Sequence, residues 1–452
     1  MLGASLKLAF YHPNPDLQAP WNYAQIGLLI FPLSPLLGAV GIGFAALITW
    51  LRQNHTIIHR PLNWGFAALS ILLIITCGFA DDKTTAFLGL FNFLPFFLLF
   101  VGLSALIQTT AQLRQIAWIL VIGSVPLTIM GFGQLFFSWT LKFQFLWIVF
   151  DWAIAPGGDP PGRMAGLFMH ANTFAAYLAI AFTLGLGLWL EEWRLGIGYR
   201  FRRINNHLVA IPQPSCPLLF LTVTVIANFV ALILTDSRNG WAIAIVACLA
   251  YAFYQGWRIL VGGVLGVAAS ILLAAFAPLA IAKIFRQVVP AFFWARLNDD
   301  MYPDRPVALM RKTQWEFAWS LTQQHPWTGW GLRNFTALYK AQTQIDLGHP
   351  HNLFLMLSAE TGLPSTVLFF GLLGWIFFAG IQLLGKSNYM ATKDRLIVFS
   401  YLLVFVEWLL FNTVDVTLFD FRLNTLSWLL LSAICGVAFY YNQPQKLVAD
   451  KN

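Results

Sequence analysis

Long apolar runs follow one another along most of this chain, and they constrain its fold more than any other feature. A membrane-spanning helix needs about 20 mostly apolar residues, and about eleven runs approach or exceed that length. Charged residues make up only 10% of the chain, too few to solvate a globular surface of this size. The sequence therefore predicts an all-α polytopic membrane protein that forms a single integral membrane domain over residues 1–452. The runs lie near 22–51, 62–79, 86–108, 115–137, 164–190, 217–235, 240–254, 259–284, 363–384, 396–414 and 422–441.

The first run sets the number of crossings. Pro32 and Pro35 interrupt it, so it is either one kinked helix or a hairpin of two. The chain accordingly has about 11 or 12 transmembrane helices. We favour the hairpin, because an even number places both termini on the same side.

Basic residues in short loops indicate the orientation of the chain in the membrane. Loops 52–61, 191–216 and 385–395 and the C-terminal tail carry Arg or Lys and are predicted to be cytoplasmic. The alternate loops then face outward, and the longest of them, at 285–350, is a large periplasmic loop. The outward-facing loops are 80–85, 138–163, 236–239, 285–350 and 415–421.

Several basic residues depart from this rule, because they lie on the predicted outer face. Such a face suits an anionic ligand such as a phosphate or a lipid headgroup, although long loops and anionic lipids also tolerate arginine. The net charge of +8 is explained by topology and by this face, so it does not indicate nucleic acid. The basic residues concerned are Arg163, Arg238, Arg286, Arg296, Arg305, Arg311, Lys312 and Arg333.

The segment from Gly348 to Asn352 closes the long loop and leads into an apolar helix. Its two imidazoles, of His349 and His351, can exchange protons near neutral pH, and polar groups at the mouth of a membrane helix are costly unless they are used. If the helix starts at Pro350, a turn of about 100° per residue places Glu360 opposite His351. A His351–Glu360 dyad is therefore not expected, and an outer-face arginine is the expected partner of Glu360. The alternative is that His351 is only an interfacial polar residue.

Three other segments place polar groups on the same face. Arg163 to Asn172 includes His170 and enters the fifth run, where Asn172 can line a cavity or bond across helices. Asp236 to Gly240 forms a tight turn that presents Arg238, either to a ligand or to Asp236. The sequence from Arg311 to Trp319 predicts an amphipathic helix, and its aromatic residues suggest a lid packed over the membrane region. A Gly-x-Gly follows at Gly329 and Gly331, without the strand–turn–helix context of a phosphate-binding loop.

Metal chemistry is not predicted. Asp299, Asp300 and Asp304 form the acidic cluster of the outer loops, and Arg296 and Arg305 flank it as ready partners. The four cysteines have no metal-binding or redox spacing and are expected to be core residues.

Together these segments resemble the O-antigen ligase and polymerase superfamily, the Wzy-type membrane glycan transferases. In the ligases, His followed by Asn, Ser or Gln, nine residues and Gly-x-x-Gly ends the large periplasmic loop. Here His351 and Asn352 precede Gly362-Leu363-Pro364-Ser365, in which Ser365 replaces the last glycine. The family's other patterns are similar to three sets of residues in this chain. These are Arg163, Gly166 and Asn172; Ser237, Arg238 and Gly240; and Arg311, Trp315, Pro326, Gly329 and Gly331.

The resemblance implies transfer of a glycan from a polyprenyl (undecaprenyl) diphosphate carrier at the periplasmic face of the inner membrane. It requires no metal or cofactor, because the leaving group is already a diphosphate. His351, Arg238 and Arg311 are the expected catalytic residues, and His349 is left as a bystander. The expected partners are the carrier-linked glycan, a lipid A-core or other glycan acceptor, and membrane lipids. Expected substrate-binding residues are Arg163, Asn172, Asn352, Trp315, Arg333 and Glu360.

Two further functions stay open at this stage. A polymerase of the same superfamily would use a second carrier-linked glycan as acceptor, and the change to Ser365 weakens the preference for a ligase. A solute or anion (bicarbonate-like) transporter is less favoured. Such proteins often show two related halves and polar midplane helices, and this sequence places its polar residues at one face.

Overall fold

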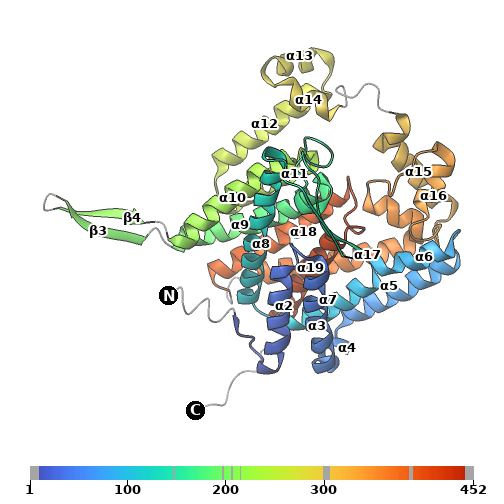
Figure 1. Ribbon diagram of the computed structural model, residues 1–452, viewed down its shortest axis with the longest axis horizontal. Helices are drawn as coiled ribbons and strands as arrows, with labels where there is room; N and C mark the ends of the chain where they lie inside the picture. Colours follow the sequence, from blue (N-terminus) through green and yellow to red (C-terminus); the bar gives the residue numbers. More distant parts are fainter. Residues whose placement is uncertain are drawn as a thin grey trace.

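Helices form most of the regular structure in the computed structural model, which describes residues 10–145, 148–195, 198–204, 207–213, 215–298, 306–385 and 390–442 (Figure 1). In these ranges, nine helical segments are long and apolar enough to cross a membrane. The chain is an all-α polytopic membrane protein, as the sequence predicts. The nine are α3 (Pro35–Arg52), α5 (Pro61–Gly78), α6 to α7 (Lys83–Gly89 and Leu94–Leu106), α8 (Thr110–Phe136), α9 (Ala171–Leu195), α10 (Cys216–Leu234), α12 (Arg258–Phe276), α17 (Leu353–Gly385) and α19 (Phe421–Asn442).

The first apolar run is a hairpin of two helices, which agrees with the favoured interpretation. α2 (Gln18–Ile30) packs along α3, and glycines let the two backbones approach closely. A Cβ atom on Gly27 would lie 2.8 Å from the carbonyl oxygen of Gly38. α11 (Arg238–Gln255) and α18 (Thr392–Asn412) also pack within the bundle, against α9. These three helices lie in the bundle beside the nine candidate spans of the described ranges.

Short elements connect these helices. Two antiparallel hairpins, β1 (Leu141–Phe145) with β2 (Ile148–Ile154) and β3 (Gly198–Ile204) with β4 (His207–Gln213), lie in the predicted loops 138–163 and 191–216. The other short helices are η1 (Pro15–Leu17), α4 (Asn54–Ile58), η2 (Leu90–Asn92), η3 (Gly166–Phe168), α13 (Leu279–Val288), α14 (Ala291–Leu297), η4 (Val307–Leu309), α15 (Arg311–Gln324) and α16 (Phe335–Thr343).

α9 and α19 are the central helices. In each, 83% of the apolar window is buried inside the protein, compared with 33% for α3, α5, α10 and α17 and 11% for α12. α18 packs against both of them. The polar ends of these central helices are therefore surrounded by protein and can hold side chains in fixed positions.

Loops predicted to share the outer face are bonded to one another, which supports that part of the topology. The Asp81 amide donates to the Trp330 carbonyl at 3.1 Å, and the Asp82 amide donates to the Asn334 side chain at 3.1 Å. Arg163 Nε donates to the Thr235 carbonyl at 2.9 Å. These bonds tie the long loop to the turn before α6, and the loop after α8 to the end of α10.

The Gly-x-Gly segment of the long loop docks on a break in α17. At Gly362 the backbone has φ 76° and ψ 167°, which interrupts the helix. The Trp330 amide donates to the Ala359 carbonyl at 2.9 Å, and the Leu363 amide donates to the Pro326 carbonyl at 2.8 Å. A Cβ atom on Gly329 would lie 2.4 Å from the carbonyl carbon of Glu360, so glycine is required for this contact. The segment is a backbone clamp on α17.

α15 and α16 cover the clamp and pack on α17 beside α5 and α6 (Figure 1). A second hydrophobic cluster, separate from that of the bundle, joins the three helices. The predicted helix is therefore confirmed, and its aromatic residues pack as expected; that the segment acts as a lid stays a prediction. The cluster contains Ala318, Leu321, Phe335, Tyr339 and Ala359, with Phe317 and Trp330 against it.

Candidate active site

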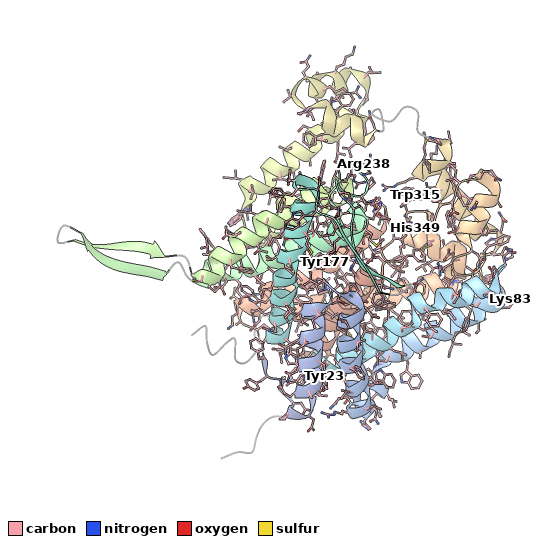
Figure 2. The ribbon with its side chains drawn as sticks, viewed as in Figure 1. Tyr23, Lys83, Tyr177, Arg238, Trp315 and His349 are labelled. Atoms are coloured by element: carbon pink, nitrogen blue, oxygen red, sulfur yellow. The ribbon has the colours of Figure 1, made fainter. Side chains whose placement is uncertain are left out.

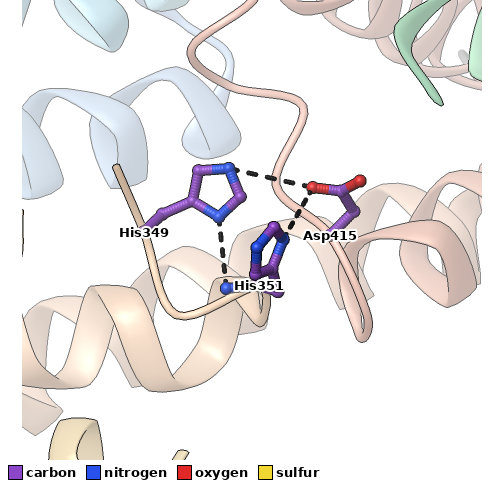
Figure 3. A group of neighbouring side chains, drawn as sticks. All are labelled: His349, His351 and Asp415. Carbon is purple, nitrogen blue, oxygen red and sulfur yellow. Dashed lines mark hydrogen bonds and ion pairs between the residues drawn. The ribbon is translucent and has the colours of Figure 1, made fainter. Parts of the chain in front are cut away.

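Asp415 is the centre of a polar cluster at the outer ends of the central helices (Figure 3). It lies in the turn between α18 and α19, and its side chain is 13% exposed. Its Oδ1 lies 3.3 Å from His351 Nδ1 and 3.8 Å from His349 Nε2, and accepts the Val416 amide at 2.9 Å. Sequence reasoning did not select Asp415. The only indication in the sequence was that Asp415 is an acidic residue in a short loop predicted to lie on the same face as His351.

The charges in this cluster follow from burial and pairing. Burial opposes ionisation of Asp415, but the His351 hydrogen bond and the charges of both histidines outweigh it and lower the pKa of the carboxyl. Burial, His351 and the more distant Arg311 lower the pKa of His349 to about 4, against the attraction of Asp415. At neutral pH Asp415 is therefore a carboxylate and His349 a neutral imidazole.

Hydrogen bonds define which ring nitrogen carries the proton. Because the Asp415 carboxylate can only accept, His351 Nδ1 is the donor at 3.3 Å, and in the neutral ring Nε2 keeps its lone pair. His349 Nδ1 accepts the His351 amide at 3.1 Å, so its proton is on Nε2. His349 also stacks on Phe419, with ring centroids 5.8 Å apart. His349, which the resemblance leaves as a bystander, thus lies against His351, with ring centroids 4.5 Å apart, and accepts its backbone amide.

His351 lies outside α17, so the expected helix start at Pro350 is wrong. The backbone of His351 has φ 53°, in the left-handed region that a helix cannot contain. Asn352 instead begins the helix, because its Oδ1 accepts the Leu355 amide at 3.0 Å. Its Nδ2 donates to the Thr413 carbonyl at 3.0 Å, which joins the start of α17 to the end of α18. Both polar atoms of this expected substrate-binding residue thus have protein partners.

Arg163 and Asn172 reach the cluster from the other side of Asp415. An Arg163 Nη donates to Asn172 Oδ1 at 2.7 Å, and Asn172 Nδ2 donates to Asp415 Oδ2 at 3.4 Å. The sequence predicts that Asn172 either lines a cavity or bonds across helices. In the structure its side chain bonds to Arg163 and Asp415. A chain of contacts therefore runs from Arg163 through Asn172 and Asp415 to His351.

His170 is a third imidazole at this site. The residue as a whole is exposed, and its Nδ1 accepts the Asn172 amide at 3.2 Å, so Nε2 carries the proton. Burial of part of the ring and the charge of Arg163 lower its pKa, against the attraction of Asp415. At neutral pH it is a hydrogen-bond donor beside His351.

Figure 2 shows Arg238, Trp315 and His349 in the upper middle of the molecule, below α13 and α14. Arg238 is the first residue of α11, and Arg311 is the first residue of α15. A helix N-terminus presents unpaired amides and a partial positive charge, which adds to a guanidinium there. The charge of Arg311 reaches His349. Trp315 lies one turn along α15, and its indole Nε1 is buried without a hydrogen-bond partner among the described residues.

Arg333 and Glu360 lie at the clamp and not in the Asp415 cluster. Arg333 has φ 63°, and Glu360 is 1% exposed. The Glu360 carboxylate faces the amides of Arg333 and Phe335 at the start of α16 without a well-aligned hydrogen bond, and the charge of Arg333 reaches it. The structure thus agrees that Glu360 is not the partner of His351. Its position indicates a role in holding α16.

Left-handed backbone marks each motif segment. The non-glycine residues with positive φ include Met169, Asp236, Arg333 and His351, each in or next to a segment that the sequence selected. Such conformations cost about 1–3 kcal/mol each and concentrate at functional sites. The outer turns are therefore constrained by the surrounding fold.

By distance, this cluster could also hold a metal ion. Donor atoms of His349, His351 and Asp415 lie within 4.8 Å of one another. A metal ligand would use the lone pair of the nitrogen that faces Asp415, whereas in the structure His351 Nδ1 lies 3.3 Å from the Asp415 carboxylate and donates to it. The arrangement is a hydrogen-bond network. The acidic cluster Asp299, Asp300 and Asp304 lies outside the described residues.

Residues 223–370 match the family described as O-antigen ligase. The match covers about a third of the chain and supports its resemblance to the O-antigen ligase and polymerase superfamily. It includes Arg238, Arg311, Trp315, His351 and Asn352, whereas Arg163, Asn172 and Asp415 lie beyond it. No curated protein matches the chain. The Asp415 contacts therefore extend the site from the matched segment to the two central helices.

Proposed function

We propose that this protein transfers a polysaccharide from a polyprenyl diphosphate carrier to a hydroxyl of a lipid acceptor such as lipid A-core, at the periplasmic face of the inner membrane. The single observation that carries the proposal is the orientation of His351 by Asp415, at 3.3 Å. This contact leaves the lone pair of Nε2 available to a substrate hydroxyl. The match of residues 223–370 to the O-antigen ligase family supports glycan transfer in general.

In the proposed reaction His351 is the general base. The acceptor hydroxyl gives its proton to His351 Nε2 while its oxygen bonds to the anomeric carbon of the glycan. The bond from that carbon to the diphosphate breaks, and its electron pair leaves with the carrier. Asp415 stabilises the imidazolium that forms, because its carboxylate already accepts the Nδ1 proton.

Two arginines at helix N-termini are suited to bind the diphosphate leaving group. The polyprenyl diphosphate gains negative charge as it departs, and Arg238 and Arg311 each open a helix, with the charge of Arg311 reaching His349. Guanidinium groups bind phosphate oxygens through paired N–H donors and stabilise this charge. Arg163 is assigned a positioning role, because its Nε and one Nη bond to Thr235 and Asn172.

The test replaces His351 and, separately, Arg238 with Ala in cells that lack the chromosomal copy, and resolves the surface glycan on a gel. For a ligase, both variants leave free lipid A-core and accumulated long carrier-linked chains. Arg258→Ala is the matched control, because Arg258 begins α12 at the opposite face. It should give the normal profile.

Other outcomes identify the competing functions. A core that carries a single repeat unit indicates a polymerase, which would use the same base with another glycan as acceptor. A normal glycan profile in both site variants, with the protein present in the membrane, contradicts the enzymatic proposal and favours transport.

A further inference from the structure

α13 presents an apolar face away from the protein, directly after a membrane span. Ile281, Ile284 and Val288 are 44%, 65% and 84% exposed. At about 100° per residue they fall within an arc of about 60°, and Lys283 lies about 130° from its centre. In water this exposed face would be unfavourable by about 25 cal/mol for each Å².

The position of α13 is close to the bilayer surface. α12 ends at Phe276 and α13 begins at Leu279, so the two ends are separated by at most about 10 Å. The polar headgroup region adds about 5–7 Å to each side of the hydrocarbon core. α13 therefore begins within or beside the headgroups, on the same face as Arg238.

A set of contacts fixes α13 across the end of the span. Arg286 Nε donates to the Ala274 carbonyl in the last turn of α12 at 2.8 Å, and its guanidinium lies 4.0 Å from the ring centroid of Trp294 in α14. Ala282 and Val289 are buried in this joint. Because the eighth residue of α13 bonds back to the span, the helix folds across the end of α12 and does not extend straight away from it.

The surface of α12 continues onto this face. Only 11% of the α12 window is buried in the protein, so most of its side chains must contact lipid. α13 and α14 stand beyond α12 at the edge of the molecule (Figure 1). An amphipathic helix with apolar residues on one side and basic residues on the other is the usual form of an interfacial membrane anchor.

We propose that α13 and α14 form a membrane-surface anchor. The Ile281–Ile284–Val288 face enters the boundary between headgroups and acyl chains, and Lys283 on the other side reaches lipid phosphates. The anchor holds the start of the long loop against the leaflet. This proposal rests on the membrane fold and is independent of the proposed reaction.

Lipid quenching tests the anchor in the full-length protein. Ile281→Cys and Lys283→Cys are made singly in a Cys216→Ser background, because Cys216 is the exposed cysteine among the described residues. Each is labelled with a fluorophore in nanodiscs that contain phosphatidylglycerol and lipids with brominated tails. We expect at least about threefold stronger quenching of the label at 281 than of the label at 283. Val288→Cys is a second probe of the apolar face and should behave like 281.

Three results would overturn the anchor. Equal quenching at 281 and 283 would show that the helix has no preferred face toward lipid. Stronger quenching of the 281 label by aqueous iodide would place the face in water. Shielding of that label from both quenchers would show that protein, such as a second copy of the chain, covers it.

Discussion

The two ends of the central helices carry polar clusters of different character. At the outer end, Asp415 orients His351, whose Nε2 has no hydrogen bond to another described residue. At the opposite end, Arg114 Nε donates to Glu191 at 2.9 Å and one of its Nη atoms to Asp394 at 3.2 Å, while Thr110 also donates to Asp394. The Arg114 cluster joins α8, α9 and α18 through bonds between its own members. Polar groups that satisfy one another hold helices together, whereas a group left with an open lone pair can act on a substrate.

The largest expected effect is the loss of transfer rate when His351 is replaced. His351→Gln removes the general base and should lower the transfer rate by about 10²–10⁴. The measurement is glycan transfer in proteoliposomes, with the amount of folded protein determined in parallel. His349→Gln is the matched control and should retain the rate within about tenfold, since it does not offer the base. Equal losses in the two variants would contradict the assignment.

Arg114 should behave in the opposite way. Arg114→Leu leaves Glu191 and Asp394 without their partner and should cost about 3–5 kcal/mol in the free energy of unfolding. The transfer rate per folded molecule should stay close to that of the unmodified protein. Thermal unfolding in detergent micelles, followed by tryptophan fluorescence, measures the first quantity. If Arg114→Leu kept a normal unfolding temperature but lost the transfer rate, the Arg114 cluster would have a role in the reaction, which would contradict the assignment of the site to the Asp415 cluster.

Acid should weaken the fold through His349. The unfolded chain binds a proton at this residue below its ordinary pKa of 6.5, whereas the folded protein does so only near pH 4. The free energy of unfolding therefore decreases as pH falls from 6.5 to 4, by up to about 3 kcal/mol. Asp415 does not contribute in this window, because its folded pKa lies below its ordinary value of 3.8 and its stabilisation is lost only at lower pH.

His349→Gln measures that contribution. The decrease in unfolding temperature between pH 6.5 and 4 should be smaller in this variant than in the unmodified protein. Identical pH profiles would show that His349 is not held neutral by burial.

The smallest expected effect concerns divalent metals. If His351 Nδ1 donates to Asp415 and binds no metal, chelation by EDTA followed by removal of the chelator should leave the transfer rate unchanged. Loss of activity that returns with zinc or manganese would show that the cluster binds a metal and that the tautomer assignment is wrong.

The sequence predicts the membrane fold well but the site only in part. Apolar runs and loop charges predict the spans and the shared face, because length and solvation impose them on any membrane helix. Asp415 could not be selected, since a single acid in a short loop carries no spacing signal. The helix start was misplaced because proline at 350 and asparagine at 352 both suit a helix N-terminus, and only the left-handed His351 decides between them. Gly329 and Gly331 are only a weak signal for a phosphate-binding loop in the sequence, and their contact with α17 could not be predicted because it depends on tertiary packing.

The rate of an Asp415→Asn variant tests the central claim most directly. An asparagine preserves the shape of the side chain but offers no carboxylate to orient the proton on His351 Nδ1. We predict a fall of about 10²–10⁴ in transfer rate, with an unfolding temperature close to that of the unmodified protein at neutral pH. A rate within about tenfold of the unmodified protein, in correctly folded variant, would contradict the claim that Asp415 prepares His351 to act as the base.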